Sequence, residues 1–359
     1  MNNHRFFASR IVVSQASALV LLAAASVARA EEAPAAPVAA PAETAAPATE
    51  PTAAEAPAPA AAPAAPVEEA PPPAAAKPKP PPYSLPWQLR PAAPGNVVRL
   101  DSSYAFYKNP TTNKSGSALA TSLLGSYKII PDLALIGRVG LVHNSAPDAP
   151  APAPQSATSI LNPVIAGLYG IKLSPAFKLG LFLGVALPVG TGGGTSPDAN
   201  KTAANGVGVL TRSAFDNAMF AVNYFTVFPG VDVAYVANNL TVQVEATILK
   251  LTKVRGPDTI DHTNTNFTSG LHVGYFILPM LSVGAEIRHQ RWLSTPNAVS
   301  KDATHASRDN TTFAIGPRLH FKLSDKVWFR PGVSLTLPID DPMKKAEYKI
   351  VQLDLPLAF

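Results

Sequence analysis

The stretch that decides the fold is Tyr348-Lys-Ile-Val-Gln-Leu-Asp-Leu-Pro-Leu-Ala-Phe359. From Val351 to Phe359 every second residue is apolar, and polar or small residues stand between them. Successive side chains of a β-strand point to opposite faces, so this stretch predicts a strand with one apolar and one polar face. Soluble sandwiches and membrane barrels both use such strands, and alternation alone does not distinguish them.

Similar alternation recurs upstream in long segments. Strands that cross a bilayer need about 9–11 residues, whereas strands of soluble proteins average about five or six. We count twelve segments, with ten to fourteen as the range, at 97–108, 118–129, 133–143, 158–173, 177–189, 219–236, 240–252, 265–278, 281–293, 311–323, 326–339 and 347–359. For the sixth, a short helix over Arg212–Val222 is an alternative interpretation. Because proline cannot donate a ladder hydrogen bond, we expect bulges or bends at Pro163, Pro229 and Pro317.

The connections between these segments alternate between tight and long. Tight turns are expected near 130–132, 174–175, 238–239, 279–280 and 324–325. Long polar connections are expected at 109–117, 144–157, 190–214, 254–264, 294–310 and 340–346. Short turns on one side and longer loops on the other are typical of outer-membrane barrels, and an even strand count suits a closed chain with both ends on the same side.

These features together resemble outer-membrane β-barrel proteins of the channel or transporter type. In that class a terminal aromatic residue preceded by alternating apolar residues is the signal for the barrel-assembly machinery, and the resemblance implies this role for Leu353, Leu355, Leu357 and Phe359. Leu187-Pro188-Val189-Gly190 is similar to the Leu-Pro-Thr-Gly step of channel-like proteins linked to uptake of aromatic and other hydrophobic compounds. The expected fold is therefore all-β, a single-chain antiparallel transmembrane β-barrel of about 12 strands over residues 95–359 in the outer membrane.

The N-terminal quarter of the chain differs in composition. Residues 1–30 are predicted to be a secretory signal peptide, with a basic start, an apolar stretch and the small residues Ala28 and Ala30 at the cleavage site. Residues 31–94 are predicted to be a disordered Pro/Ala-rich linker in the periplasm, because such a composition has almost nothing large to bury. Its 31–82 arm either contacts the cell wall or a periplasmic partner, or is a solvated tail.

Several classes of function find no support. No Lys/Arg run is longer than two residues, so no nucleic-acid role is expected. The chain has no cysteine, and the spacing of His262, His289 and His305 fits no standard metal-ligand motif, so we expect no metal and no cofactor. The glycine-rich Gly190–Gly194 stretch lacks the Lys-Ser/Thr of a phosphate loop.

If the apolar face of each strand contacts lipid, the residues on the opposite face point into the lumen. Charges inside membrane proteins usually face the interior and pair with one another. We expect Asp354 to pair with Arg99 and Arg330 on the neighbouring strands. The residues expected to line the lumen are Arg99, Asp101, Arg138, Asp232, Gln243, Glu245, Glu286, Arg288, Arg318, His320, Arg330, Gln352 and Asp354.

Three hypotheses about function follow. The first is a channel or transporter for passive passage of small solutes, through a lumen lined by paired Arg and Asp/Glu. The second is a structural protein with a closed, salt-bridged lumen that links membrane and cell wall. Whether the 190–214 loop folds into the lumen is left open by the sequence.

The third hypothesis is a lipase at the rim of the barrel. His143-Asn144-Ser145 resembles the His-x-Ser part of the outer-membrane phospholipase site, which also uses an asparagine, and Asn162 is the nearest candidate for it. Asp258, Asp261 and His262 form the only local group that resembles an omptin-like protease site. The residues surrounding the phospholipase site are missing here, so we expect that the protein is not an enzyme.

Overall fold

The structure, a computed structural model, describes residues 83–150 and 152–359. These residues form one antiparallel sheet that closes on itself, because β1 (Val97–Lys108) pairs with β15 (Lys349–Ala358). The strands between them are β2 (Ser115–Ile130), β3 (Leu133–Ser145), β4 (Ala157–Ile160), β5 (Val164–Lys172), β6 (Phe177–Ala186), β7 (Tyr224–Ala237), β8 (Leu240–Lys253), β9 (Thr263–Leu278), β10 (Leu281–Trp292), β11 (Asp309–Leu319), β12 (Phe321–Lys322), β13 (Trp328–Phe329) and β14 (Gly332–Pro338). The predictions about residues 1–82, including the cleavage site, lie outside this described part.

The predicted closed antiparallel barrel of 12 strands is confirmed. Within the described residues the sheet has fifteen strand segments. They correspond to twelve strands of the wall, because three of these strands are interrupted and appear as two segments each: β4 and β5, β11 and β12, and β13 and β14. The strand expected at 219–236 begins only at Tyr224, and a helix, α3 (Asn217–Phe220), precedes it. The interpretation of 212–222 as a short helix was therefore closer to the structure.

The three prolines in question affect the strands in different ways. Pro163 stands between β4 and β5, where the strand is interrupted. Pairing of β7 with β8 is missing around Pro229 and pairing of β11 with β14 is missing around Pro317, but the register is the same on both sides of each gap. Of the bulges or bends expected there, the bulges were wrong, because a missing N–H interrupts pairing with one neighbour without inserting an extra residue.

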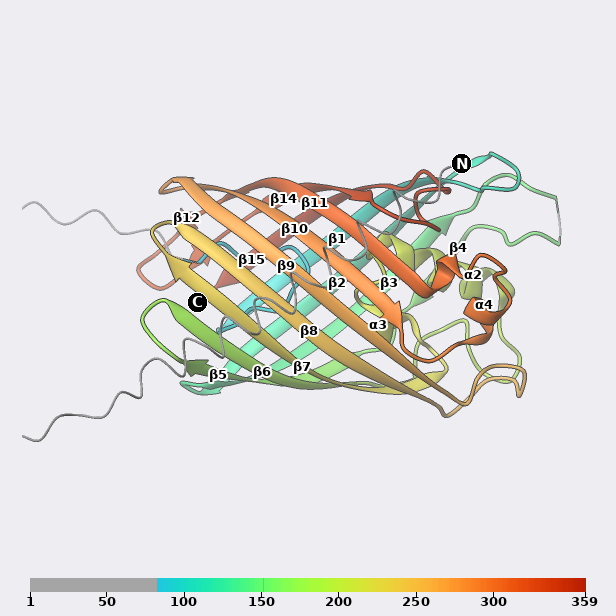
Figure 1. The fold of residues 1–359 in the computed structure, drawn as a ribbon, viewed down its shortest axis with the longest axis horizontal. Coiled ribbons are helices and arrows are strands. Elements are labelled where there is room, and N and C mark those ends of the chain that lie inside the picture. The colour runs from blue at the N-terminus through green and yellow to red at the C-terminus, as the bar shows by residue number, and fades with distance from the viewer. Residues whose placement is uncertain (1–82, 151) are drawn as a thin grey trace, which may run out of the picture. The chain divides into compact units, whose positions relative to one another are not determined.

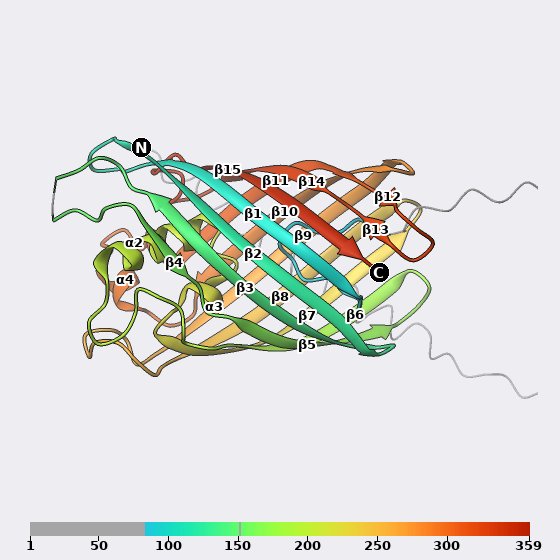
Figure 2. The same ribbon diagram turned by 180° about the vertical axis from the view of Figure 1, so that it is seen from behind.

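The two ends of the barrel differ (Figures 1 and 2). At one end, here called the turn end, short turns connect β2 to β3, β5 to β6, β7 to β8 and β9 to β10, and the C-terminus lies there. Asn238 and Asn239 both have positive φ, which suits the tight turn between β7 and β8. The other end, the loop end, carries the long connections with α2 (Ala199–Thr211), α4 (Asn297–Ser300) and the 3₁₀ turn η1 (Ala306–Arg308).

The outer face of the wall is apolar. On β15, Val351 is 42% exposed and Leu353 45%, whereas Gln352 and Asp354 between them are completely buried. Large apolar side chains are exposed in the same way on β1, β2, β3, β5, β9 and β14. So large an apolar surface is unfavourable in water, and a closed sheet leaves no unpaired edge in hydrocarbon. In the described part of the chain, no helix has the length and hydropathy that crossing a membrane requires.

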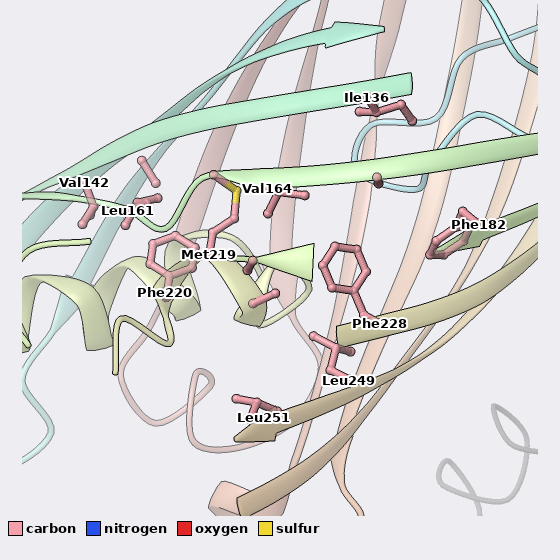
Figure 3. Close-up of a cluster of buried hydrophobic side chains, with 14 of the residues drawn as sticks. Ile136, Val142, Leu161, Val164, Phe182, Met219, Phe220, Phe228, Leu249 and Leu251 are labelled. Carbon is pink, nitrogen blue, oxygen red and sulfur yellow. The ribbon is translucent and has the colours of Figure 1, made fainter. Parts of the chain in front are cut away.

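Inside the barrel, apolar side chains gather on one side of the lumen (Figure 3). They come from β3, β5, β6, β7 and β8, and Met219 and Phe220 of α3 pack against them. The side chain of Asp198 caps α2 by accepting hydrogen bonds from the N–H groups of Asn200 and Lys201. On the inner face of α2, Gly208 lets Phe220 approach so closely that a Cβ there would lie 2.5 Å from the ring.

Candidate functional site

The lumen contains a segment of the chain that precedes β1. This N-terminal segment, Tyr83–Pro94, lies among the inward-facing side chains of the wall, and Trp87 and Leu89 are 1% and 0% exposed. These residues were predicted to belong to the disordered linker. They are ordered because Trp87 and Leu89 supply the large apolar side chains that residues 31–82 lack, apart from two valines.

Glu286 on β10 holds the main chain of the N-terminal segment. Its carboxylate accepts hydrogen bonds from the backbone N–H of Trp87 at 2.7 Å and of Gln88 at 3.0 Å. Arg288, on the same strand, donates to this carboxylate at 2.6 Å and offsets its charge. Gln352 of β15 donates to the carbonyl of Trp87 at 3.1 Å. Hydrogen bonds to an ionised carboxylate are stronger than neutral ones, so the segment is firmly bound at this point.

Three residues farther along, the segment makes a second set of contacts. Glu245 on β8 accepts from the backbone N–H of Arg90 at 2.6 Å and also pairs with its guanidinium group. The side-chain amide of Gln243 donates to the carbonyl of Arg90. The guanidinium group of Arg90 lies over the ring of Phe182, 4.4 Å from its centre. The N-terminal segment is therefore held on both sides of the lumen.

A second segment enters from the loop end. This infolded loop, residues 187–223, connects β6 to β7 and carries α2 and α3. Its Arg212 donates to both carboxylate oxygens of Asp101 on β1, at 2.6 and 2.8 Å. Its Asp216 accepts from Arg138 on β3 at 2.6 and 3.0 Å. The two loop residues also pair with each other at 2.9 Å, so one continuous charge network ties the loop to two strands.

The ionisation of Asp216 supports this attachment. Burial would raise the pKa of its carboxyl group, but the guanidinium groups of Arg138 and Arg212 lower the pKa well below the ordinary value. The carboxylate is therefore charged near neutral pH, and the ion pairs that hold the loop persist there.

Asp354 on β15 joins a third cluster of charges. It accepts from Arg99 at 2.6 and 3.0 Å and from Arg318 on β11 at 2.5 Å. The prediction that Arg330 pairs with Asp354 was wrong. The strand is broken between β13 and β14, and the N–H of Arg330 bonds the carbonyl of Pro356, beyond Asp354. Arg318 takes its place, and its guanidinium group also lies over the ring of Trp87, 4.5 Å from the centre.

All thirteen residues expected in the lumen have side chains that turn into the barrel. Arg138 and Arg330 are partly buried, and the other eleven are buried. Asp101, Glu245, Glu286 and Asp354 form ion pairs with arginines, and four of these arginines (Arg99, Arg138, Arg288 and Arg318) were among the expected residues. That they line a conducting pore stays a prediction.

Three residues of the charge networks were not predicted from the sequence, namely Arg90, Arg212 and Asp216, which lie on the two entering segments. The apolar part of the lumen was not predicted either. The β6 residues whose side chains face the lumen are Lys178, Gly180, Phe182, Gly184 and Ala186. Both faces of this strand are therefore largely apolar, and no pattern of charged residues identifies the face that lines the lumen. The two glycines beside Phe182 are the available signal, since Gly184 leaves room for the ring of Phe228 and Gly180 leaves room for Ala92 of the N-terminal segment.

A cavity of about 440 Å³ lies between the two segments. Apolar residues of the cluster in Figure 3 form much of its wall, among them Ile136, Phe182, Phe228 and Leu249. Phe215, Ala218 and Met219 of the infolded loop line it toward the loop end, and Lys128 and Lys326 line it at the turn end. The volume falls within the range of about 300–1,000 Å³ that is usual for ligand pockets.

The rim candidates are only partly brought together. Ser145 lies 3.3 Å from the Nε2 atom of His143, and the Nδ1 atom of His143 lies 2.9 Å from the hydroxyl of Thr158. Asn162 is completely buried and bonds the backbone of the infolded loop, so it is not part of this group. Among the described residues, no three His, Cys, Asp or Glu side chains form a group suited to a metal ion.

The remaining candidates at the loop end have other contacts. Asp258 pairs with Lys253, and the carboxylate of Asp261 accepts from the N–H of Asn297. His289 contacts the hydroxyl of Thr311 at 2.9 Å. None of these contacts joins Asp258, Asp261 and His262 into an omptin-like arrangement.

The fold and its apolar outer face define a transmembrane β-barrel of the outer-membrane type. By sequence, the chain matches no known family model and no curated protein. Among solved structures, its fold is similar to an outer membrane channel from Pseudomonas putida F1 (12% identity, TM-score 0.48, covering 76% of this chain and 98% of that one). It is also similar to the NanC porin (9%, 0.43, 73% and 98%) and to the KdgM porin in complex with disordered oligogalacturonate (11%, 0.40, 73% and 99%).

Proposed function

We propose that this protein is an outer-membrane channel or transporter through which small solutes pass without an energy source. The observation that carries the proposal is the cavity inside the closed barrel, which reaches the turn end and ends beneath the infolded loop. In this arrangement the infolded loop controls passage at the loop end, and the N-terminal segment narrows the lumen nearer the turn end. Steps in current across a planar bilayer that contains the purified full chain would test the proposal.

The same proposal includes the molecules that contact the protein. Outer-membrane lipid contacts the apolar outer face, and the barrel-assembly machinery recognises Leu353, Leu355, Leu357 and Phe359. The arm over residues 31–82 extends into the periplasm, where the cell wall is a candidate partner. Leu353 supports the assembly signal because its exposed apolar side chain lies on the outer face of β15, and Phe359 is exposed at the turn end.

The alternative is a structural protein with a closed lumen. The two entering segments and the paired charges favour it, because together they fill much of the interior. A full chain that gives no current in any variant would support this alternative and contradict the channel.

Releasing the infolded loop should increase the current. Arg212→Glu places a third carboxylate beside Asp101 and Asp216, so electrostatic repulsion should expel the loop from the lumen and raise the single-channel conductance severalfold. Lys201→Glu is the matched control, since it makes the same charge change in the same loop at a half-exposed position, and it should leave the conductance unchanged. Equal conductance of both variants and the unaltered chain would mean that the loop does not control passage.

The contact between His143 and Ser145 keeps the rim lipase as a further candidate. A nucleophile, a base and a residue that orients the base are the parts that such chemistry needs. If this site hydrolyses acyl esters, Ser145→Ala should abolish release of fatty acid from phospholipid vesicles, and Ser117→Ala on the neighbouring strand should have no effect. For a channel we expect no hydrolysis by the unaltered protein.

A further inference from the structure

The cavity in the lumen has an uneven distribution of charge. Seven of the side chains that line it are cationic, and two, Asp101 and Asp216, are carboxylates. Both carboxylates already pair with arginines, Asp101 with Arg212 and Asp216 with Arg138. The cavity therefore has an excess of positive charge, which favours anions in a low-dielectric interior.

The unpaired cations lie toward the turn end. Three of the seven cations, Arg90, Arg99 and Arg138, pair with carboxylates, whereas the other four have no carboxylate partner among the described residues. These four are Lys128, Lys178, Lys326 and Arg330. The Nε atom of Arg330 is buried and has no hydrogen-bond partner within the described part of the chain. A buried donor without a partner is unfavourable, so an acceptor in this position would be stabilising.

The opposite part of the cavity is largely apolar, although the guanidinium group of Arg90, which pairs with Glu245, lies over the rings of Phe182 and Phe228. Phe182 and Phe228, on neighbouring strands, turn into it, and Ile136, Leu249 and Met219 complete this side (Figure 3). Lys178 stands on the same face of β6 as Phe182, nearer the turn end, with its ammonium group 5.5 Å from the ring centre of Tyr83. The apolar wall thus leads directly to one of the unpaired cations, Lys178.

We propose that the cavity binds a small organic acid with an apolar body, such as an aryl or medium-chain carboxylate. The apolar body packs against Phe182 and Phe228, and the carboxylate is placed between Lys178 and Arg330. A neutral apolar solute would leave these cations uncompensated, and a hydrophilic anion would not use the aromatic wall. The inference deepens the proposed function, on which it rests, by naming the class of solute.

The test measures binding separately from transport. The full chain in lipid nanodiscs is titrated calorimetrically with 4-phenylbutyrate, with the neutral 4-phenylbutan-1-ol and with the cationic 4-phenylbutylammonium, and empty nanodiscs correct for partitioning. We expect the carboxylate to bind roughly tenfold more tightly than the alcohol, as for one charge-assisted hydrogen bond. The ammonium compound should bind more weakly than either.

Two kinds of variant locate the site. Lys178→Gln and Arg330→Gln should each remove most of the preference for the carboxylate while the alcohol binds as before. Leu249→Gln should weaken both compounds, because it makes the apolar wall polar. Lys322→Gln is the matched control, since Lys322 pairs with Asp325 at the turn end and does not line the cavity.

The possible results are distinguishable. An alcohol that binds as tightly as the carboxylate, or a preference that survives both Lys178→Gln and Arg330→Gln, overturns the inference. If current flows but no preference is found, the channel proposal stands and the solute class is wrong. If the preference is found but no current flows in any variant, the binding site stands and the channel proposal is wrong.

Discussion

Deleting residues 83–94 is expected to raise the single-channel conductance of the reconstituted barrel severalfold. The N-terminal segment lies inside the lumen, where Trp87 is bonded to Glu286 and lies beneath the guanidinium group of Arg318, and Leu89 packs against Gly270 of β9. Without the segment, water and ions should occupy the space that it fills, and the carboxylates that held it should be hydrated. The measurement is the current of single insertions in a planar bilayer, compared with that of the unaltered full chain.

The control deletes an equal length of the arm, residues 51–62, and keeps the N-terminal segment. Its conductance should equal that of the unaltered chain. Trp87→Ala is a milder variant that removes one large side chain from the lumen and leaves the backbone contacts, so it should give an intermediate conductance. If the 83–94 deletion folds and conducts like the control, the segment does not restrict passage.

Replacing Asp354 is expected to have the largest effect on stability. Asp354→Asn keeps the shape of the side chain but leaves Arg99 and Arg318 as two buried cations without their shared carboxylate. Removing one partner of a buried ion pair costs about 3–5 kcal/mol. The free energy of unfolding, or the temperature at which the barrel loses its resistance to detergent denaturation, measures this change.

Asp325→Asn provides the matched control, because that carboxylate pairs with Lys322 on the exposed surface of a turn. Exposed ion pairs contribute little, so its unfolding should be unchanged. The double variant Asp354→Asn with Arg318→Met should recover part of the lost stability, since it removes one uncompensated cation. An Asp354→Asn barrel as stable as the control would show that the cluster does not support closure of the barrel.

Alternation of side chains was sufficient to predict the wall of the barrel. On β15 the phase of Gln352 and Asp354 identifies the inner face from local sequence alone, because strand geometry fixes which side each residue faces. The partner of Asp354 was harder to predict. Choosing Arg318 over Arg330 requires knowing that the strand is broken between β13 and β14, and this break depends on pairing with neighbouring strands.

The contents of the lumen were not predictable in the same way. Arg212 and Asp216 lie in a loop, where no periodic pattern of apolar and polar residues predicts that the chain turns into the lumen. The N-terminal segment follows a long Pro/Ala-rich stretch and was grouped with it, although Trp87 and Leu89 differ from that composition. The position of such segments depends on complementary groups elsewhere, such as Glu286 and Asp101, which are far from them in sequence.

The manner in which Glu286 and Glu245 hold the N-terminal segment has an evolutionary consequence. Their carboxylates recognise backbone amides at Trp87, Gln88 and Arg90, which every residue except proline possesses. Side chains such as that of Gln88 can therefore vary among related chains while the N-terminal segment remains bound in the lumen. Selection should instead act against proline at these three sites and in favour of acidic residues at 245 and 286.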